Sequence, residues 1–328
     1  MEYRKLGKTG LSVSAISIGT WQVGGKWGAN FSHSNADSIL SAAVDAGVNF
    51  IDTADVYGDG ESEKAVGRLV RSRSEKIYVA TKCGRQLNPH VSEAYQVPAL
   101  RKFVENSLSN MGLETIDLLQ LHCPPPAVYY RPEIFELFDQ LKREGKIQHM
   151  GVSVEKVEEA IKAIEFENVT TVQIIFNMFR QRPAELFFRE AKKKEIGIIV
   201  RVPLASGLLT GKFNSSSTFT SGDHRQFNRA GDAFDKGETF SGIEYETGLV
   251  AVEALKQLFP GQENLAPIAL KWILQFDAVS CIIPGASSNS QVDSNISALS
   301  VAGFTNIQLQ GVQEIYEKFI KKSVHQLW

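Results

Sequence analysis

Short apolar runs alternate with longer amphipathic stretches along nearly the whole chain. Runs of Val, Ile and Leu between turn residues are typical of buried strands, whereas apolar positions three and four residues apart are typical of helices. The runs predict strands over Ala15–Thr20, Val48–Ala54, Lys76–Lys82, Ile116–His122, Ile147–Ser153, Thr170–Phe176, Ile196–Val202 and Val279–Gly285. The amphipathic stretches predict helices over Asn35–Ala46, Ser62–Val70, Val97–Met111, Pro132–Arg143, Val154–Phe166, Pro183–Lys194 and Ser288–Leu299. This alternation is expected of repeated βα units around a parallel sheet.

Two parallel architectures compete for this pattern. A doubly wound open sheet usually carries a GxGxxG turn after its first strand, and the corresponding stretch here, "GTWQVGGKWG", lacks that spacing. Eight βα units in about 300 residues favour a closed (β/α)8 TIM barrel instead. We therefore predict an α/β fold in which residues 1–328 form a single barrel domain. An N-terminal hairpin and extra helices over 244–259 and 307–322 would complete it.

Three segments interrupt the repeat, at residues 20–31, 123–132 and 212–243. Each follows the carboxyl end of a predicted strand, which is the end where barrels of this kind bind ligands. We therefore expect these loops to surround the functional site.

Composition narrows the class of protein. The 35 Lys and Arg residues are balanced by 37 Asp and Glu residues, so we do not expect a nucleic-acid partner. No apolar run approaches the ~18 residues of a membrane helix, and the charged N-terminus lacks a signal-peptide pattern. The three cysteines lie outside any CxxC pattern, which favours a reducing compartment. We expect a soluble cytoplasmic protein without a membrane partner; the sequence does not reveal its oligomeric state.

Side chains capable of proton chemistry end three neighbouring strands. Asp52, Lys82 and His122 lie at the ends of the second, third and fourth predicted strands, and Tyr57 follows in the loop after the second. Adjacent strands are only ~5 Å apart, so these four side chains are expected to meet at one mouth of the barrel. A neighbouring ammonium favours the phenolate and is expected to lower the pKa of Tyr57, which would suit it to general acid–base catalysis. Asp52 would keep Lys82 protonated, and a neutral His122 would orient a substrate oxygen.

Several motifs, in the same order, resemble those of the aldo-keto reductase superfamily. "NFIDTADVYGDGESEKAVG" resembles the family's first signature, "IYVATK" its lysine strand and "DLLQLHCPPP" its histidine strand. "HMGVS", "VPLASGLLTGKF" and "IPGASSNSQVDSN" resemble later segments of the family, up to Asn295. The resemblance implies an NAD(P)H-dependent oxidoreductase without a metal, which moves hydride between a nicotinamide and the carbonyl of an aldehyde, ketone or sugar. It also implies that Asp52, Tyr57, Lys82 and His122 form the catalytic tetrad.

The same resemblance implies that the cofactor lies extended across the barrel mouth. The matching positions are Gly19, Thr20, Trp21, Asp52, Ser153, Gln173, Arg201, Leu204, Ser206, Gly207, Leu209, Gly211, Lys212, Gly285, Ala286, Gln291 and Asn295. Family members often have an aromatic ring where this chain has Arg201, whose planar guanidinium could stack on the nicotinamide instead. The segment "GASSNSQ" has no cation for a 2′-phosphate, but Lys212 or Arg225 could supply one. We therefore favour NADPH, with NADH as the alternative.

Aromatic side chains in the predicted mouth loops indicate the substrate end of the site. Trp21, Trp27 and Tyr129, together with Tyr57 and His122, are the predicted substrate contacts. Aromatic rims suit sugar rings and aromatic aldehydes alike, so the substrate and the direction of the reaction stay open.

Two other functions are compatible with the same barrel. One is a lyase in which Lys82 forms a Schiff base with the substrate. The other is a non-catalytic, nucleotide-sensing regulatory subunit. Turnover of added cofactor distinguishes both from a reductase.

Overall fold

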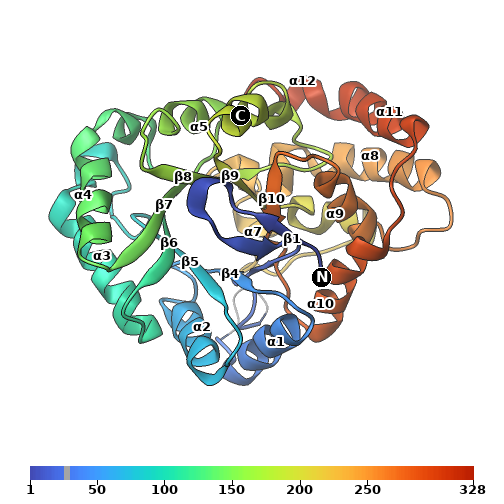
Figure 1. Cartoon of the computed structure of the whole chain (residues 1–328). Coiled ribbons are helices and arrows are strands. Elements are labelled where there is room, and N and C mark those ends of the chain that lie inside the picture. The colour runs from blue at the N-terminus through green and yellow to red at the C-terminus, as the bar shows by residue number, and fades with distance from the viewer. Residues whose placement is uncertain (26–29) are drawn as a thin grey trace.

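The computed structural model describes residues 1–25 and 30–328. Its main sheet is parallel, in the order β10-β9-β8-β7-β6-β5-β4-β3. Parallel bridges from Ile16 to Ile282 and from Gly19 to Gly285 join the two edges, so the sheet closes into the predicted barrel (Figure 1). The strands are β3 (Ile18–Gly19), β4 (Phe50–Asp52), β5 (Tyr78–Cys83), β6 (Ile116–His122), β7 (Ile147–Ser153), β8 (Val169–Ile175), β9 (Gly197–Arg201) and β10 (Val279–Ile282).

Helices surround the barrel (Figure 1). They are α1 (His33–Asp45), α2 (Glu61–Ser72), α3 (Val97–Met111), α4 (Pro132–Arg143), α5 (Val157–Ala163), α6 (Phe187–Lys193), α7 (His224–Phe227), α8 (Tyr245–Leu258), α9 (Ala266–Leu274), α10 (Asn289–Ile296), α11 (Asn306–Ile315) and α12 (Lys321–Val324). Apolar side chains on the inner faces of most of these helices join those of the strands in one continuous core. In the described chain, no helix has both the length and the apolar character needed to cross a membrane.

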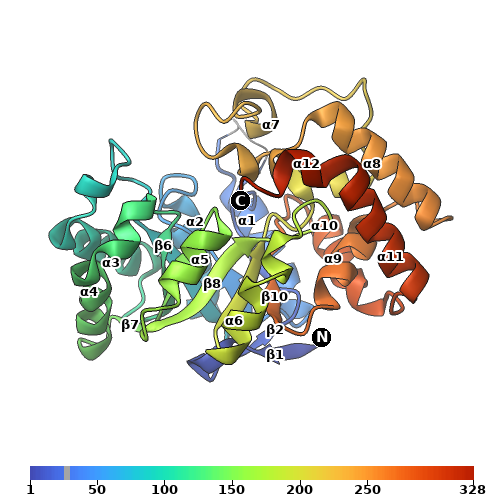
Figure 2. The same cartoon turned by 90° about the horizontal axis from the view of Figure 1, so that it is seen from above.

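The predicted N-terminal hairpin fills one end of the barrel. Its strands β1 (Tyr3–Lys5) and β2 (Ser12–Ser14) pair antiparallel, and Leu6, Leu11 and Val13 pack inside the barrel against residues such as Phe50. Figure 2 shows the hairpin and α7 at opposite ends of the barrel. The open end is therefore the one at which the strands finish.

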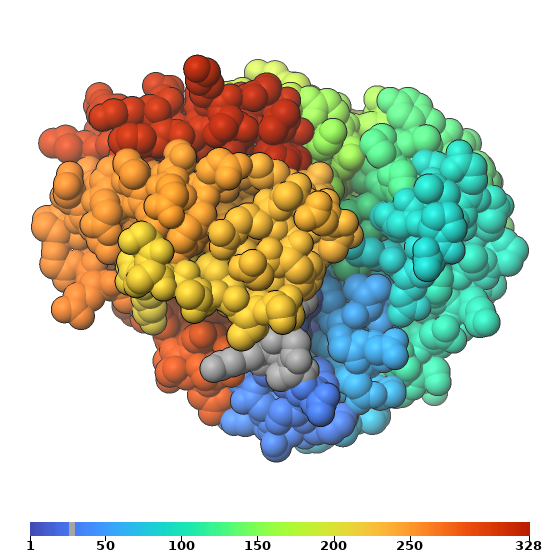
Figure 3. Space-filling view, turned by 180° about the vertical axis from the view of Figure 1, so that it is seen from behind, coloured from blue at the N-terminus to red at the C-terminus, as the bar shows by residue number. Residues whose placement is uncertain are grey.

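Residues 212–243, which we call the strap, lie across this open end. Figure 3 shows its yellow-to-gold atoms spread over the middle of that face. The strap is attached to the barrel through the Asn177 amide, which donates to Ser241 Oγ at 2.8 Å, and through Ser206 Oγ, which donates to the Glu238 carbonyl at 3.1 Å. Trp328 Nε1 also donates to Asp235 at 2.8 Å. The strap is consequently part of the site and not a peripheral loop.

The observed elements differ from several predicted ranges, and two of the differences have an evident cause. The helix expected from Val154 begins only at Val157, because the Glu159 carboxylate accepts from the backbone N–H groups of Glu155 and Lys156 at 2.9 and 3.1 Å and caps the helix there. Helix α9 was not predicted at all. It is buried on most sides, so its sequence, "APIALKWIL", lacks the polar face that would indicate an amphipathic helix.

Helices α2 and α3 approach closely at Gly67. A Cβ atom on Gly67 would lie 2.0 Å from the carbonyl oxygen of Met111. Because the obstacle is backbone, a side chain fits only if one of the helices moves. Gly67 therefore sets the distance between these two helices.

Gly67→Ala is expected to lower the free energy of unfolding by about 1–3 kcal/mol, because the added methyl group overpacks this contact. Alanine otherwise stabilises a helix interior by roughly 1 kcal/mol relative to glycine, so a loss identifies the steric cause. Urea unfolding followed by circular dichroism measures the change. Gly303→Ala is the control, since a Cβ there meets nothing within 4 Å. Equal unfolding midpoints for Gly67→Ala and the wild type would contradict this packing.

Candidate active site

The four side chains with proton chemistry lie together at the open end of the barrel. Asp52 ends β4, His122 ends β6, and Lys82 is the penultimate residue of β5. The Lys82 ammonium lies 2.5 Å from Asp52 Oδ2 and 3.3 Å from the Tyr57 hydroxyl. It also donates to the Thr53 carbonyl at 2.8 Å. The parallel register thus brings together residues from three strand ends.

Lys82 and Asp52 form a buried ion pair, with side chains 1 % and 2 % exposed. The second oxygen of Asp52 accepts from the Gln173 amide at 2.7 Å and from the Gln120 amide at 3.1 Å. Burial alone would lower the pKa of Lys82, but the charge of Asp52 and the hydrogen bonds with Asp52 and Tyr57 raise it above its ordinary value. Lys82 therefore stays an ammonium, and an ammonium has no lone pair for attack on a carbonyl carbon. This disfavours the Schiff-base alternative.

The pKa of Tyr57 does not fall as expected. Burial raises it, and this effect together with the Asp52 charge outweighs the lowering by Lys82, so the pKa lies above 10.0. The sequence-based expectation was wrong because it considered the ammonium and not the desolvation of the phenolate. Tyr57 therefore carries its proton at neutral pH, as a proton donor must.

His122 is kept neutral. Burial lowers its pKa well below the ordinary value, and the cationic groups of Arg85, Lys82 and Arg201 lower it further. Its ring lies edge-on to that of Tyr57, with centroids 6.0 Å apart. Within the described structure the buried Nδ1 has no hydrogen-bond partner.

The tetrad opens into a groove of ≈ 560 Å³ that reaches the start of α10. Most predicted cofactor positions line it: Gly19, Thr20, Trp21, Asp52, Gln173, Arg201, Leu204, Ser206, Gly207, Lys212, Gly285, Gln291 and Asn295. Four do not line it, namely Ser153, Leu209, Gly211 and Ala286. Ser153, Leu209 and Ala286 are fully buried, so their side chains belong to the protein interior. Sequence reasoning overlooked other lining residues, among them Gln22, Asn264, Ser290 and Ser294.

The groove has the volume and the donor groups that a bound dinucleotide would need. Its volume is within the ~300–1,000 Å³ range of small-molecule sites. Lys212, Arg225 and Ser290 offer donors for negatively charged groups, and the first turn of α10 lies beside them, with backbone N–H groups that favour anions. At Gly285 a Cβ would meet its nearest neighbour, Gln22 Oε1, only at 3.5 Å, so the glycine leaves space open in the wall.

Known proteins are similar to this chain in both sequence and fold. A model of the aldo/keto reductase family matches residues 15–317. The aldo-keto reductase YhdN of Bacillus subtilis (strain 168) is 31 % identical over 303 residues, which are 89 % of this chain and 87 % of the relative. The chain belongs to the aldo/keto reductase family.

Further matches cover almost the whole reductase. The L-glyceraldehyde 3-phosphate reductase of Escherichia coli (strain K12) is 27 % identical over 335 residues, 96 % of this chain and 92 % of that one. The solved structure of the glycerol dehydrogenase AKR11B4 from Gluconobacter oxydans superposes with a TM-score of 0.77 at 28 % identity, covering 98 % and 96 % of the two chains. The protein is thus an oxidoreductase of a family that uses NAD(P)H and acts on small carbonyl compounds.

A smaller cavity of ≈ 280 Å³ adjoins the tetrad of the reductase. It is lined by Trp21, Val56, Tyr57, Arg85, His122, Phe234 and Glu238. Three of the predicted substrate contacts, Trp21, Tyr57 and His122, line this cavity, and Trp27 lies outside the described residues. The prediction for Tyr129 was wrong, because this side chain is 1 % exposed and packs in the outer core.

Arg201 lines the groove, but its guanidinium is held in ion pairs. It lies 2.8 Å from Glu155 and 3.3 Å from Glu238, and Arg85 contacts Glu238 from the other side at 2.7 Å. Burial would raise the pKa of Glu238, but the two guanidinium groups lower it, so this carboxylate is ionised. Burial and the neighbouring Glu238 raise the pKa of Glu155, against the lowering by Arg201.

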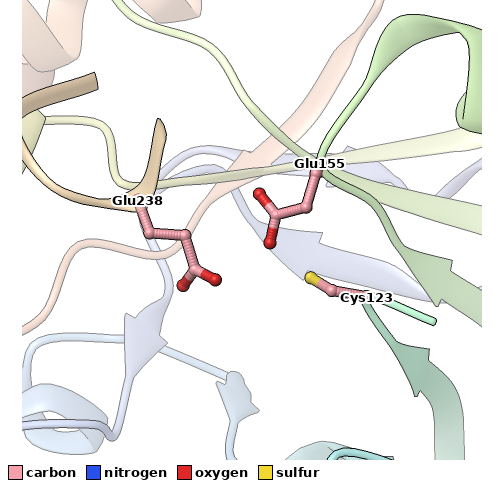
Figure 4. A group of neighbouring side chains, drawn as sticks. All are labelled: Cys123, Glu155 and Glu238. Atoms are coloured by element: carbon pink, nitrogen blue, oxygen red, sulfur yellow. The ribbon is translucent and has the colours of Figure 1, made fainter. Parts of the chain in front are cut away.

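Figure 4 shows Cys123, Glu155 and Glu238 directed toward a common space, with ligand atoms within 4.8 Å of one another. Arg201 already contacts both carboxylates and lies 3.5 Å from the Cys123 sulfur. A metal ion there would be repelled by this guanidinium. We therefore describe the cluster as an ion-pair network, and the absence of a metal from the reaction stays a prediction.

Asp55 is a further buried carboxyl group near Lys82. It is 3 % exposed, and no side chain of the described residues hydrogen-bonds to its carboxylate oxygens. Burial, followed by the charge of Glu63, raises the pKa of Asp55 from 3.8 to about 7. Between these two values the folded state holds a proton that the unfolded chain has lost, so the free energy of unfolding falls as the pH rises through this range.

Asp55→Asn removes this dependence, because an amide stays neutral at every pH. The stability of the variant relative to the wild type is expected to increase by roughly 2–4 kcal/mol between about pH 4 and pH 8. Urea unfolding at a series of pH values measures the difference. Asp232→Asn, in the strap and without a resolved role, serves as the control. Parallel pH profiles for Asp55→Asn and the wild type would contradict the assignment.

Proposed function

We propose that this reductase transfers hydride between NADPH and the carbonyl carbon of an aldehyde, ketone or sugar, with Tyr57 as general acid in reduction and general base in oxidation. One observation carries the proposal: the Lys82 ammonium contacts both the buried Asp52 carboxylate and the Tyr57 hydroxyl, beside a groove of dinucleotide size. Bound NADPH would supply the hydride to the carbonyl carbon.

The chain's own residues would handle the proton. The Tyr57 O–H bond breaks as its proton passes to the carbonyl oxygen, which becomes the alcohol hydroxyl. The phenolate left behind is stabilised by Lys82, 3.3 Å away, and takes up a proton before the next reduction. Neutral His122 would donate a hydrogen bond to the same substrate oxygen and fix its position.

A screen of NADPH and NADH oxidation with aldehydes, ketones and open-chain sugars tests the proposed function. Turnover with any carbonyl compound would support it. Binding of cofactor without turnover across the whole panel would instead favour the nucleotide-sensing alternative.

Tyr57→Phe is expected to lower kcat for carbonyl reduction by at least ~10³-fold, because it removes the transferable proton and leaves the ring in place. The Kd of NADPH, measured by quenching of protein fluorescence, is expected to stay within about threefold of the wild type. Tyr130→Phe is the matched control, since Tyr130 is an exposed phenol outside both cavities. Near-wild-type turnover by Tyr57→Phe would overturn the assignment of the acid.

The choice of NADPH depends on a cation near the adenosine end of the groove. Arg225 is engaged by Asp223, whose carboxylate it contacts at 2.5 Å, and it stacks over Phe219 at 4.6 Å. Lys212 is exposed and lines the groove. We propose that the ammonium of Lys212 pairs with the 2′-phosphate.

Lys212→Ala is expected to raise the KM for NADPH about tenfold, which corresponds to ~1.4 kcal/mol, and to change the KM for NADH less than twofold. Steady-state kinetics with a saturating carbonyl substrate measures both values. Lys236→Ala is the control, because that strap lysine pairs with Glu244 at 2.8 Å. Equal effects on the two cofactors would contradict a contact with the 2′-phosphate.

A further inference from the structure

The smaller cavity has a polar wall that the proposed proton chemistry leaves unused. Tyr57 and His122 serve the reacting carbonyl, and Trp21 and Phe234 supply apolar surface. The remaining charged groups of the wall are Arg85 and Glu238. Such groups at the edge of a reaction site affect which substrates bind well.

Arg85 and Glu238 form a compensated pair. Arg85 Nη2 lies 2.7 Å from Glu238 Oε1, and Arg201 Nη1 lies 3.3 Å from Oε2. Each carboxylate oxygen therefore has a cationic partner and retains acceptor capacity. The Arg85 side chain is 20 % exposed, and it makes one hydrogen bond to the described part of the protein. Since a guanidinium has five N–H donors, several of them stay available to a molecule in the cavity.

This arrangement matches an uncharged group that both donates and accepts hydrogen bonds. A hydroxyl group can donate to Glu238 while it accepts from Arg85. An alkyl chain would leave the remaining N–H donors of Arg85 and the remaining acceptor capacity of Glu238 unused, which is costly in a buried site. A phosphate or carboxylate group would be repelled by the ionised Glu238, with which Arg85 is already paired at 2.7 Å.

We propose that Arg85 and Glu238 recognise a hydroxyl group next to the carbonyl of an uncharged substrate. The reductase would then prefer short hydroxyaldehydes, hydroxyketones or open-chain sugars, and would disfavour both alkyl aldehydes and carbonyl compounds that carry a phosphate group. This inference rests on the proposed function, because it assigns the substrate class of the same site.

The wild-type enzyme gives the first test. With NADPH in excess, kcat/KM is measured for glyceraldehyde, propanal and glyceraldehyde 3-phosphate, each corrected for the fraction present as free carbonyl. Glyceraldehyde is expected to exceed propanal at least ~30-fold, since a site built to bind a hydroxyl group rejects the analogue that lacks it. Glyceraldehyde is also expected to exceed its phosphate.

Glu238→Gln gives the second test. It keeps the size of the side chain but removes the negative charge, so the ratio of kcat/KM for glyceraldehyde over propanal is expected to fall at least tenfold. The relative activity with glyceraldehyde 3-phosphate is expected to rise, because Arg85 loses its anionic partner. Glu244→Gln is the matched control, a 72 % exposed carboxylate that follows the strap. Arg85→Met is a second variant for the case that Glu238→Gln does not fold. It is expected to reduce the same ratio.

The outcomes separate the two proposals. Oxidation of NADPH by propanal and glyceraldehyde at equal efficiency would overturn the hydroxyl preference and leave the proposed function intact. The same holds if Glu238→Gln lowers activity with both substrates by one factor, which would indicate that Glu238 only anchors the strap. No oxidation of NADPH by any carbonyl compound would contradict the proposed function itself.

Discussion

The buried ion pair between Lys82 and Asp52 fixes an ammonium and a carboxylate in contact at the centre of the site. Moving two charges out of water costs several kcal/mol for each ion, and here the cost is offset by close contact and by the amides of Gln120 and Gln173. Those amides come from β6 and β8, so the pair depends on the closed barrel. Its stability in turn keeps one ammonium fixed beside the Tyr57 hydroxyl.

Burial changes the pKa values of two side chains near this ammonium, Tyr57 and His122. Desolvation keeps Tyr57 protonated and His122 neutral, because each would otherwise carry a charge in a region of low polarity. The ammonium of Lys82 opposes the rise in the pKa of Tyr57 and adds to the fall in the pKa of His122. As a result, Tyr57 holds a proton at rest, yet its phenolate would form next to a positive charge, which is the combination that proton donation requires.

The sequence predicted the elements of regular pattern well and the irregular segments poorly. Helices α3 and α4 and strands β6 and β7 agree with their predicted ranges, because their apolar residues keep one period from end to end. The four strand-end residues could be predicted for the same reason, since register follows from the strands. Helix α9 was missed because an almost fully apolar segment shows no period.

The ion-pair network around Glu238 could not be predicted from local pattern. Glu238 and Arg85 are 153 positions apart in the sequence. Glu238 lies in the strap, whose path depends on tertiary contacts such as that of Asn177 with Ser241. Arg85 was overlooked as well, although it lies three residues after Lys82 at the end where the strands finish. The pKa of Tyr57 was misjudged for a related reason: the degree of burial is a property of the assembled site.

The hairpin at the opposite end of the barrel has a kinetic consequence. Leu6, Leu11 and Val13 fill the interior there, whereas both cavities lie at the other end and share Trp21, Tyr57 and His122. Under the proposed function, the cofactor and the carbonyl substrate would both enter through this open end of the barrel. The cofactor, as the larger of the two, would have to bind first and leave last, which predicts a compulsory order of binding and release.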